Sequence, residues 1–142
     1  MKLKIQFILF LSLGIAYCYS QDNFAVIGND ISVNQISIAE TKAILKGKNT
    51  FWKNGKKVIL VLPSSKHPGS NDFSKLYYNT NSDGVKRYWL SLVFQGRSSS
   101  PVFLDTDREI IEYITRNEGA VGVIDKDNLK SVEDKFKINI IK

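Results

Sequence analysis

The sequence predicts an α/β domain with one mixed β-sheet of about four or five strands, flanked by helices. Residues 58–62 (Val-Ile-Leu-Val-Leu) are continuously apolar, which is typical of a strand covered on both faces. Four other segments carry apolar residues at helical spacing, and shorter strand-like runs lie before and after them. No repeat or low-complexity linker interrupts this order, so we expect a single domain.

Residues 1–20 have the pattern of a secretory signal peptide. Two lysines within the first four residues precede a nearly all-apolar run over 5–16. The segment Cys18-Tyr19-Ser20 then places small residues at the −3 and −1 positions before Gln21. We therefore expect cleavage between Ser20 and Gln21, export to the periplasm or beyond, and a folded domain over 21–142.

Two alternatives to a cleaved signal peptide involve the membrane. A membrane anchor is disfavoured because the apolar run is shorter than the roughly 20 residues that a spanning helix needs. A lipoprotein acylated at Cys18 is the other alternative, although Tyr17 is bulky where a lipobox has a small residue.

Composition excludes several classes of protein. The 122 residues left after removal of the first 20 suit one compact domain, and Cys18 is the chain's single cysteine. A disulfide-stapled fold, a thiol nucleophile and a cysteine metal site are therefore excluded from the mature domain. It has 18 basic and 14 acidic residues, and a net charge of +4 is too small to predict nucleic-acid binding.

The first half of the domain contains two strands and a helix. Residues 24–28 are expected to form a buried strand, and 33–36 an irregular connection. Ser37 caps a helix over 38–46, because Glu40 completes a capping box and Gly47 is a natural stop. An Asn-Gly turn at 54–55 then leads into the apolar strand, which ends at Pro63.

The second half is read by the same rules, with Ser70 and Thr106 as helix N-caps. Residues 79–83 and 96–101 are expected to be polar loops. The expected elements are helices over 71–77, 84–94 and 107–116, a strand over 120–124, a short helical turn within 129–136 and an edge strand over 136–141.

Three motifs are spaced along the domain: Gly47-Lys48 followed by Trp52, Trp89 followed by Phe94-Gln95-Gly96, and Gly119-Ala120-Val121-Gly122. Together they resemble the C-terminal-lobe signatures of the substrate-binding proteins of phosphate ABC transporters. The resemblance implies a single lobe of a type 2 periplasmic-binding-protein fold. It also implies a non-catalytic role in binding phosphate or another small oxyanion.

The resemblance implies a position for the oxyanion, because a Ser-Gly-Thr tripeptide before the helix that follows the long apolar strand supplies the donors in that family. Counted back from Phe73, these positions are His67-Pro68-Gly69, which carry no hydroxyl, and Pro68 has no N–H. The alternative is an ordinary polar loop capped by Ser70. The candidate anion-binding residues are Ser65, Lys66, Ser70 and Asn71.

Enzymatic activity, cofactors and metal binding are not expected. The sequence contains no Walker loop, zinc-ligand spacing, nucleophile elbow or dinucleotide fingerprint. His67, the single histidine, is expected at the surface, and Asp105, Asp107 and Glu109 are explained by helix capping rather than by a cation site.

Three possibilities for the function and its partners are left open. The chain is either a solute-binding domain or an interaction and scaffold module that docks on an envelope or membrane protein. A third possibility is a dimer in which two lobes rebuild a cleft. Most aromatic residues are expected in the core, and exposed ones would mark a partner surface.

Overall fold

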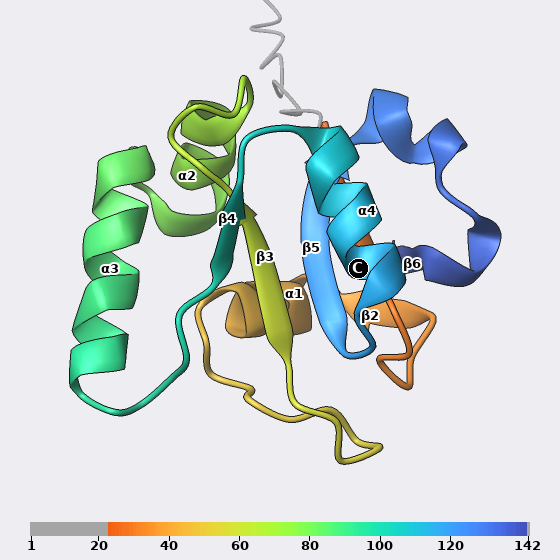
Figure 1. Cartoon of the computed structure of the whole chain (residues 1–142), viewed down its shortest axis with the longest axis horizontal. Coiled ribbons are helices and arrows are strands. Elements are labelled where there is room, and N and C mark those ends of the chain that lie inside the picture. Colours follow the sequence, from red (N-terminus) through yellow and green to blue (C-terminus); the bar gives the residue numbers. More distant parts are fainter. Residues whose placement is uncertain (1–22, 142) are drawn as a thin grey trace, which may run out of the picture.

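The computed structural model describes residues 23–141, so the predicted signal peptide and Cys18 lie outside the described residues. The described chain forms a six-stranded sheet in the order β2-β6-β1-β5-β3-β4, with helices on both faces (Figure 1). The α/β class is confirmed. The elements are β1 (Phe24–Gly28), β2 (Gln35–Ser37), α1 (Ile38–Leu45), β3 (Ile59–Pro63), α2 (Ser70–Tyr78), α3 (Ser82–Phe94), β4 (Val102–Leu104), α4 (Asp107–Arg116), β5 (Ala120–Asp125), two 3₁₀ helices (Lys126–Ser131 and Asp134–Phe136) and β6 (Lys137–Ile141).

The sheet is mixed. β1 runs antiparallel to β5 and to β6, whereas β3 runs parallel to β4 and to β5. The carboxyl ends of β3, β4 and β5 therefore meet at one edge of the sheet. In open α/β sheets this edge is where ligands bind.

Both faces of the sheet are buried, as the continuous apolar run predicts. Leu60 and Leu62 of β3 point to the face covered by α1, α2 and α3, and Val61 between them points to the face covered by α4. The first core includes Phe73 and Trp89, and the second includes Ile110 and Ile114. Figure 1 shows α1 behind β3 and α4 in front of β5.

The sheet is larger than predicted, and its edges differ. Residues 33–36 were predicted to be an irregular connection, but Gln35–Ser37 form strand β2, whose Ile36 is buried. β6 was predicted to be an edge strand, but it lies between β2 and β1. β4 was not predicted because its three residues are too few to show an apolar period.

The helix caps test the local predictions. Capping boxes are present at Ser37 with Glu40 and at Thr106 with Glu109, as predicted. The prediction for α2 was wrong, because Gly69 is the N-cap residue and Ser70 is already helical. Ser70 is buried in the first turn, and its carbonyl accepts a hydrogen bond from the Ser74 hydroxyl.

The predicted helical turn within 129–136 consists of two separate 3₁₀ helices, which bury Phe136 and bring Val132 against the α4 core. None of the helices in the described residues is long and apolar enough to cross a membrane.

Candidate functional site

The loop between β3 and α2 is the place where the sequence predicts an anion. Residues 64–69 lead from the carboxyl end of β3 to the first turn of α2, so this helix directs its N-terminus toward the ligand-binding edge of the sheet. The loop is tightly wound, because the amides of Lys66 and His67 donate to the side chain and the carbonyl of Ser64 at 3.1 Å each.

His67 is buried in this loop, which corrects the expectation of a surface residue. Its Nε2 lies 2.8 Å from Oδ1 of Asp107, and the Gly69 amide donates to its Nδ1 at 3.0 Å. Because Nδ1 accepts a hydrogen bond, the proton of the neutral ring is on Nε2, which donates to Asp107. The ring therefore satisfies one of the amides at the start of α2.

Asp107 holds three segments together. Its Oδ1 faces His67, while its Oδ2 accepts from the Asp125 amide at 3.0 Å and from Nδ2 of Asn128 at 2.7 Å. Burial alone raises the pKa of this carboxyl, but the hydrogen bonds from His67, Asn128 and Asp125 outweigh it and hold the pKa below its usual value. The carboxylate thus joins the start of α4 to the loops after β3 and β5.

The other acidic residues of this edge also have structural roles. The Ser64 hydroxyl donates to the Asp105 carboxylate, and Glu109 accepts from the amides of Asp105 and Thr106. Within the described residues no group of three or more acidic, histidine or cysteine side chains is arranged to hold a metal ion.

The four candidate anion-binding residues surround the start of α2 but do not form a cradle. Ser65, Lys66 and Asn71 are exposed, and Ser70 is buried. The amide of Ser70 donates to the His67 carbonyl at 3.1 Å, so it is not available to an anion.

Two amides at the start of α2 remain available. Those of Asn71 and Asp72 have no intrachain acceptor in the described part of the chain. A hollow of about 220 Å³ lies beside this turn. Its charged lining residues include Asp107 and Asp125, and Asp72 adds a carboxylate to the same turn, so the local field disfavours an anion.

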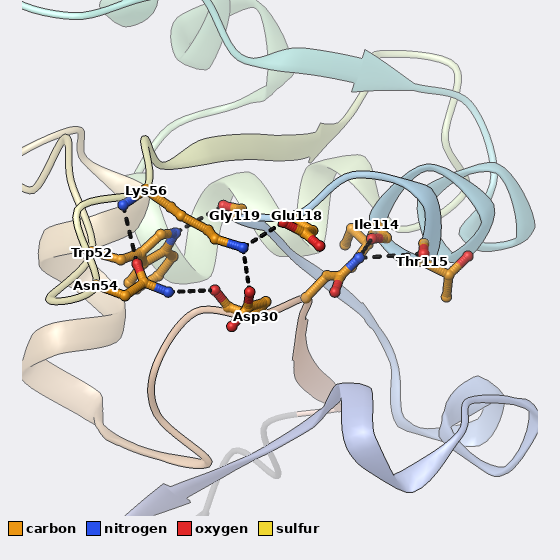
Figure 2. A network of polar contacts seen from close by, with 9 residues as sticks. Asp30, Trp52, Asn54, Lys56, Ile114, Thr115, Glu118 and Gly119 are labelled. Carbon is orange, nitrogen blue, oxygen red and sulfur yellow. Dashed lines mark hydrogen bonds and ion pairs between the residues drawn. The ribbon is translucent and has the colours of Figure 1, made fainter.

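The opposite end of β3 is held by a second network, drawn in Figure 2. The indole Nε1 of Trp52 donates to the Gly119 carbonyl at 2.8 Å, and the Ile59 amide donates to the same oxygen at 3.1 Å. The Gly119 amide in turn donates to the Asn29 carbonyl at 2.7 Å. Two of the motifs noted in the sequence are therefore in direct contact, and their role is structural.

Charged and polar side chains cover the amino end of β3 at the protein surface. Lys56 forms ion pairs with Asp30 and Glu118, and Asn54 donates to the Asp30 carbonyl at 3.0 Å (Figure 2). Hydrogen bonds from Lys56 to the two carboxylates raise the pKa of its ammonium group. The Asn54-Gly55 turn forms as predicted, with φ of +83° at Gly55.

The aromatic residues are mostly internal, as expected. The Tyr78 hydroxyl donates to the Leu45 carbonyl and accepts from Nε1 of Trp89 at 3.1 Å, and Tyr88 donates to the Lys46 carbonyl at 2.6 Å. Burial raises the pKa of Tyr78. These contacts satisfy carbonyls at the end of α1. Among residues 23–141, Phe51 and Phe94 are the exceptions, because they are exposed.

Comparison with solved structures agrees with the fold inferred from the sequence. The chain matches an ABC-type phosphate transport receptor from Vibrio cholerae with a TM-score of 0.60 at 19% identity. It also matches a protein from Clostridium perfringens, assigned as a phosphate ABC transporter substrate-binding protein and solved with bound phosphate, with a TM-score of 0.59 at 18% identity. The third example is PstS from Borrelia burgdorferi, with a TM-score of 0.58 at 15% identity.

The chain shares their fold. Each match covers 83% of this chain, but only 46%, 44% and 47% of the three receptors, in the order given. The chain therefore spans less than half the length of the proteins it resembles, and the shared fold is that of a single lobe. A scan against protein-family models and a search of curated proteins gave no match.

Proposed function

We propose that this chain is a non-catalytic, exported interaction domain that uses the fold of a solute receptor to dock on an envelope or membrane protein. The observation that carries this proposal is the hydrogen bond from the Gly69 amide to Nδ1 of His67. A free anion competes for this amide with a ring that is attached to the same loop and oriented by Asp107. The amides of Gly69 and Ser70 are thus already used within the loop itself, and a bound anion would have to displace the His67 ring or rely on the next two amides.

The surface of α3 supports the docking part of the proposal. Leu90, Val93 and Phe94 are 55%, 37% and 86% exposed on the outer side of this helix. Val93 and Phe94 follow Leu90 by three and four residues, so the three side chains form one apolar patch, with Lys86 and Arg87 one turn before it. Exposed apolar and aromatic side chains grouped in this way are typical of protein interfaces.

Titration calorimetry with phosphate and sulfate tests whether the loop before α2 binds a free anion. We expect no binding tighter than about 1 mM for the described domain. A variant that restores the donors, His67→Ser with Pro68→Gly and Gly69→Thr, should bind phosphate more tightly than the parent. A micromolar Kd for the parent protein would contradict the proposal that His67 keeps an anion from the start of α2.

Site-specific photocrosslinking in the cells of origin tests the docking surface. A crosslinking amino acid at position 94 should yield an adduct with an envelope protein, and Leu90→Lys should abolish it. The same amino acid at exposed position 126 is the control. Adducts that form equally at both positions would reject α3 as the docking surface.

A second function, weak oxyanion binding through Ser65, Lys66, Ser70 and Asn71, is favoured by one observation. The amides of Asn71 and Asp72 lack intrachain acceptors and lie at a helix N-terminus, which attracts anions. Amide shifts of these two residues during a phosphate titration, reduced by Lys66→Gln, would favour this function over docking alone.

A further inference from the structure

We infer that a groove at the amino end of β3 binds a small hydroxylated organic anion, of the sugar-phosphate or sugar-acid class. The groove has a volume of about 570 Å³ and lies between the loop after α1 and the loop after α3. Ligand sites in proteins are typically ~300–1,000 Å³, so its size suits a ligand larger than a bare phosphate ion. It lies at the opposite end of β3 from the start of α2.

The groove has an apolar floor and a polar rim. Ile44 of α1, Leu60 of β3 and Trp89 of α3 supply apolar surface, together with Val58 just before β3. The rim carries side chains with hydroxyl or amide groups, which can both donate and accept hydrogen bonds. These rim residues are Asn49, Thr50, Ser98, Ser99 and Ser100.

All of the charge in the lining is positive. Lys57 and Arg97 are its charged residues, and no carboxylate lines the groove. In the described part of the chain Lys57 has no ion pair, and Arg97 has only a 3.5 Å contact with Oε1 of Gln95. Both cations are therefore available to an anion, in contrast to Lys56, which is paired twice.

The rim also has unused hydrogen-bonding groups. The amides of Ser98, Ser99 and Ser100 have no intrachain acceptor within the described residues. The hydroxyls of Ser98 and Ser100 donate only to neighbouring carbonyls, at 3.3 and 3.2 Å. A run of free amides and hydroxyls next to Arg97 suits the oxygens of a phosphate or carboxylate together with sugar hydroxyls.

The ends of two helices do not oppose an anion here. α1 and α3 both end beside the groove, and free carbonyls at helix ends would repel an anion. At the end of α3, however, the amides of Gly96 and Arg97 donate to carbonyls of the last turn at 3.0 Å each. At the end of α1, Tyr88 donates to the Lys46 carbonyl. Those carbonyls are therefore already paired.

NMR titration of the ¹⁵N-labelled protein with glucose 6-phosphate and with gluconate tests the inference, and the two probes separate a phosphate from a carboxylate head group. At least one of them should shift the amides of Asn49, Thr50 and Ser98–Ser100, with a Kd of about 1–10 mM. Neutral glucose should bind at least about tenfold more weakly, and inorganic phosphate should not reproduce the shifts.

Three variants separate binding from folding. Lys57→Gln and Arg97→Gln should each weaken binding by about fivefold or more, while Lys126→Gln, far along the sequence and outside the lining, should leave it unchanged. The spectra themselves report whether each variant is folded. The inference is overturned if neither probe shifts the groove amides at about 20 mM, or if Arg97→Gln and Lys57→Gln bind as the parent does. Shifts confined to Asn71 and Asp72 would also overturn it, without rejecting the docking function.

Discussion

The two ends of strand β3 are closed by different kinds of contact. At the amino end, the Trp52 indole and the Ile59 amide share one backbone acceptor, the carbonyl of Gly119. At the carboxyl end, the closure depends on two side chains, His67 and Asp107, that bond to each other and to backbone amides. The comparison teaches that the amino-end contact joins residues of two motifs visible in the sequence, Trp52 and Gly119, whereas the pairing of His67 with Asp107 leaves no local pattern.

The largest effect is expected from Gly119→Ala at the amino end. Gly119 has φ of +84°, and an added Cβ would lie 2.5 Å from the Lys57 carbonyl oxygen. We expect a loss of about 3 kcal/mol in the free energy of unfolding, measured with urea. Gly55→Ala is the matched control, because Gly55 has φ of +83° but open space around it, and should cost about 1 kcal/mol. Equal losses would show that the close approach is unimportant.

Asp107→Asn should give the next largest effect, at the carboxyl end. The change removes the charge that accepts from His67, Asn128 and the Asp125 amide, and should cost about 2 kcal/mol at pH 7. Because the folded-state pKa of Asp107 is lowered, its contribution is complete above the unfolded value of about 3.9 and is lost as the pH falls through the folded value.

Urea unfolding between pH 2.5 and 6 would follow this dependence at roughly half-unit steps. The difference in stability between the parent and Asp107→Asn should be constant above about pH 5 and should shrink below about pH 4. A difference that grows on acidification would show that the carboxylate is not stabilised in the folded state.

Trp52→Phe should have a smaller effect at the amino end. The ring remains in the core, but the Gly119 carbonyl keeps only the Ile59 amide as a donor. We expect a loss of about 1–2 kcal/mol by urea unfolding. Phe51→Leu, at the neighbouring exposed position, should change stability by less than about 0.5 kcal/mol. A neutral Trp52→Phe would reduce the indole contact to simple packing.

The smallest effect is expected from Lys56→Gln. The ion pairs with Asp30 and Glu118 are partly solvent-exposed. The loss in the free energy of unfolding should therefore be smaller than for Gly119→Ala, Asp107→Asn or Trp52→Phe. It should also decrease further when salt is raised from about 0.05 to 0.5 M, because salt screens exposed charges. A loss that is independent of salt would mean that packing of the Lys56 stem, rather than its charge, closes the network.

Local chemistry made much of the fold predictable. The capping boxes at Ser37 and Thr106 and the Asn54-Gly55 turn depend on residues within four positions of each other, and all three are present in the structure. The apolar run of β3 was also sufficient to predict burial on both faces. Strand β2 was missed because its pairing partner, β6, lies about a hundred residues further along the chain and turns three unremarkable residues into a strand.

The closed loop at His67 could not be predicted for a related reason. A histidine before Pro-Gly is usually exposed, and only the fold places Asp107 beside its ring. The sequence assigned Asp107 to helix capping, although Thr106 and Glu109 form the capping box of α4 without its side chain. The candidate anion-binding residues Ser65, Lys66, Ser70 and Asn71 remain a prediction, and the groove beside Arg97 was not predicted because its rim comes from segments far apart in sequence.

The position of β1 has a consequence for synthesis. This strand is made first among the described elements, yet both of its neighbours, β5 and β6, come from the last quarter of the chain. Until residues up to about 125 have been synthesised, β1 has no strand to pair with, and its apolar side chains are not buried in the sheet. The six-stranded sheet can therefore form completely only after the residues of β5 and β6 have been synthesised.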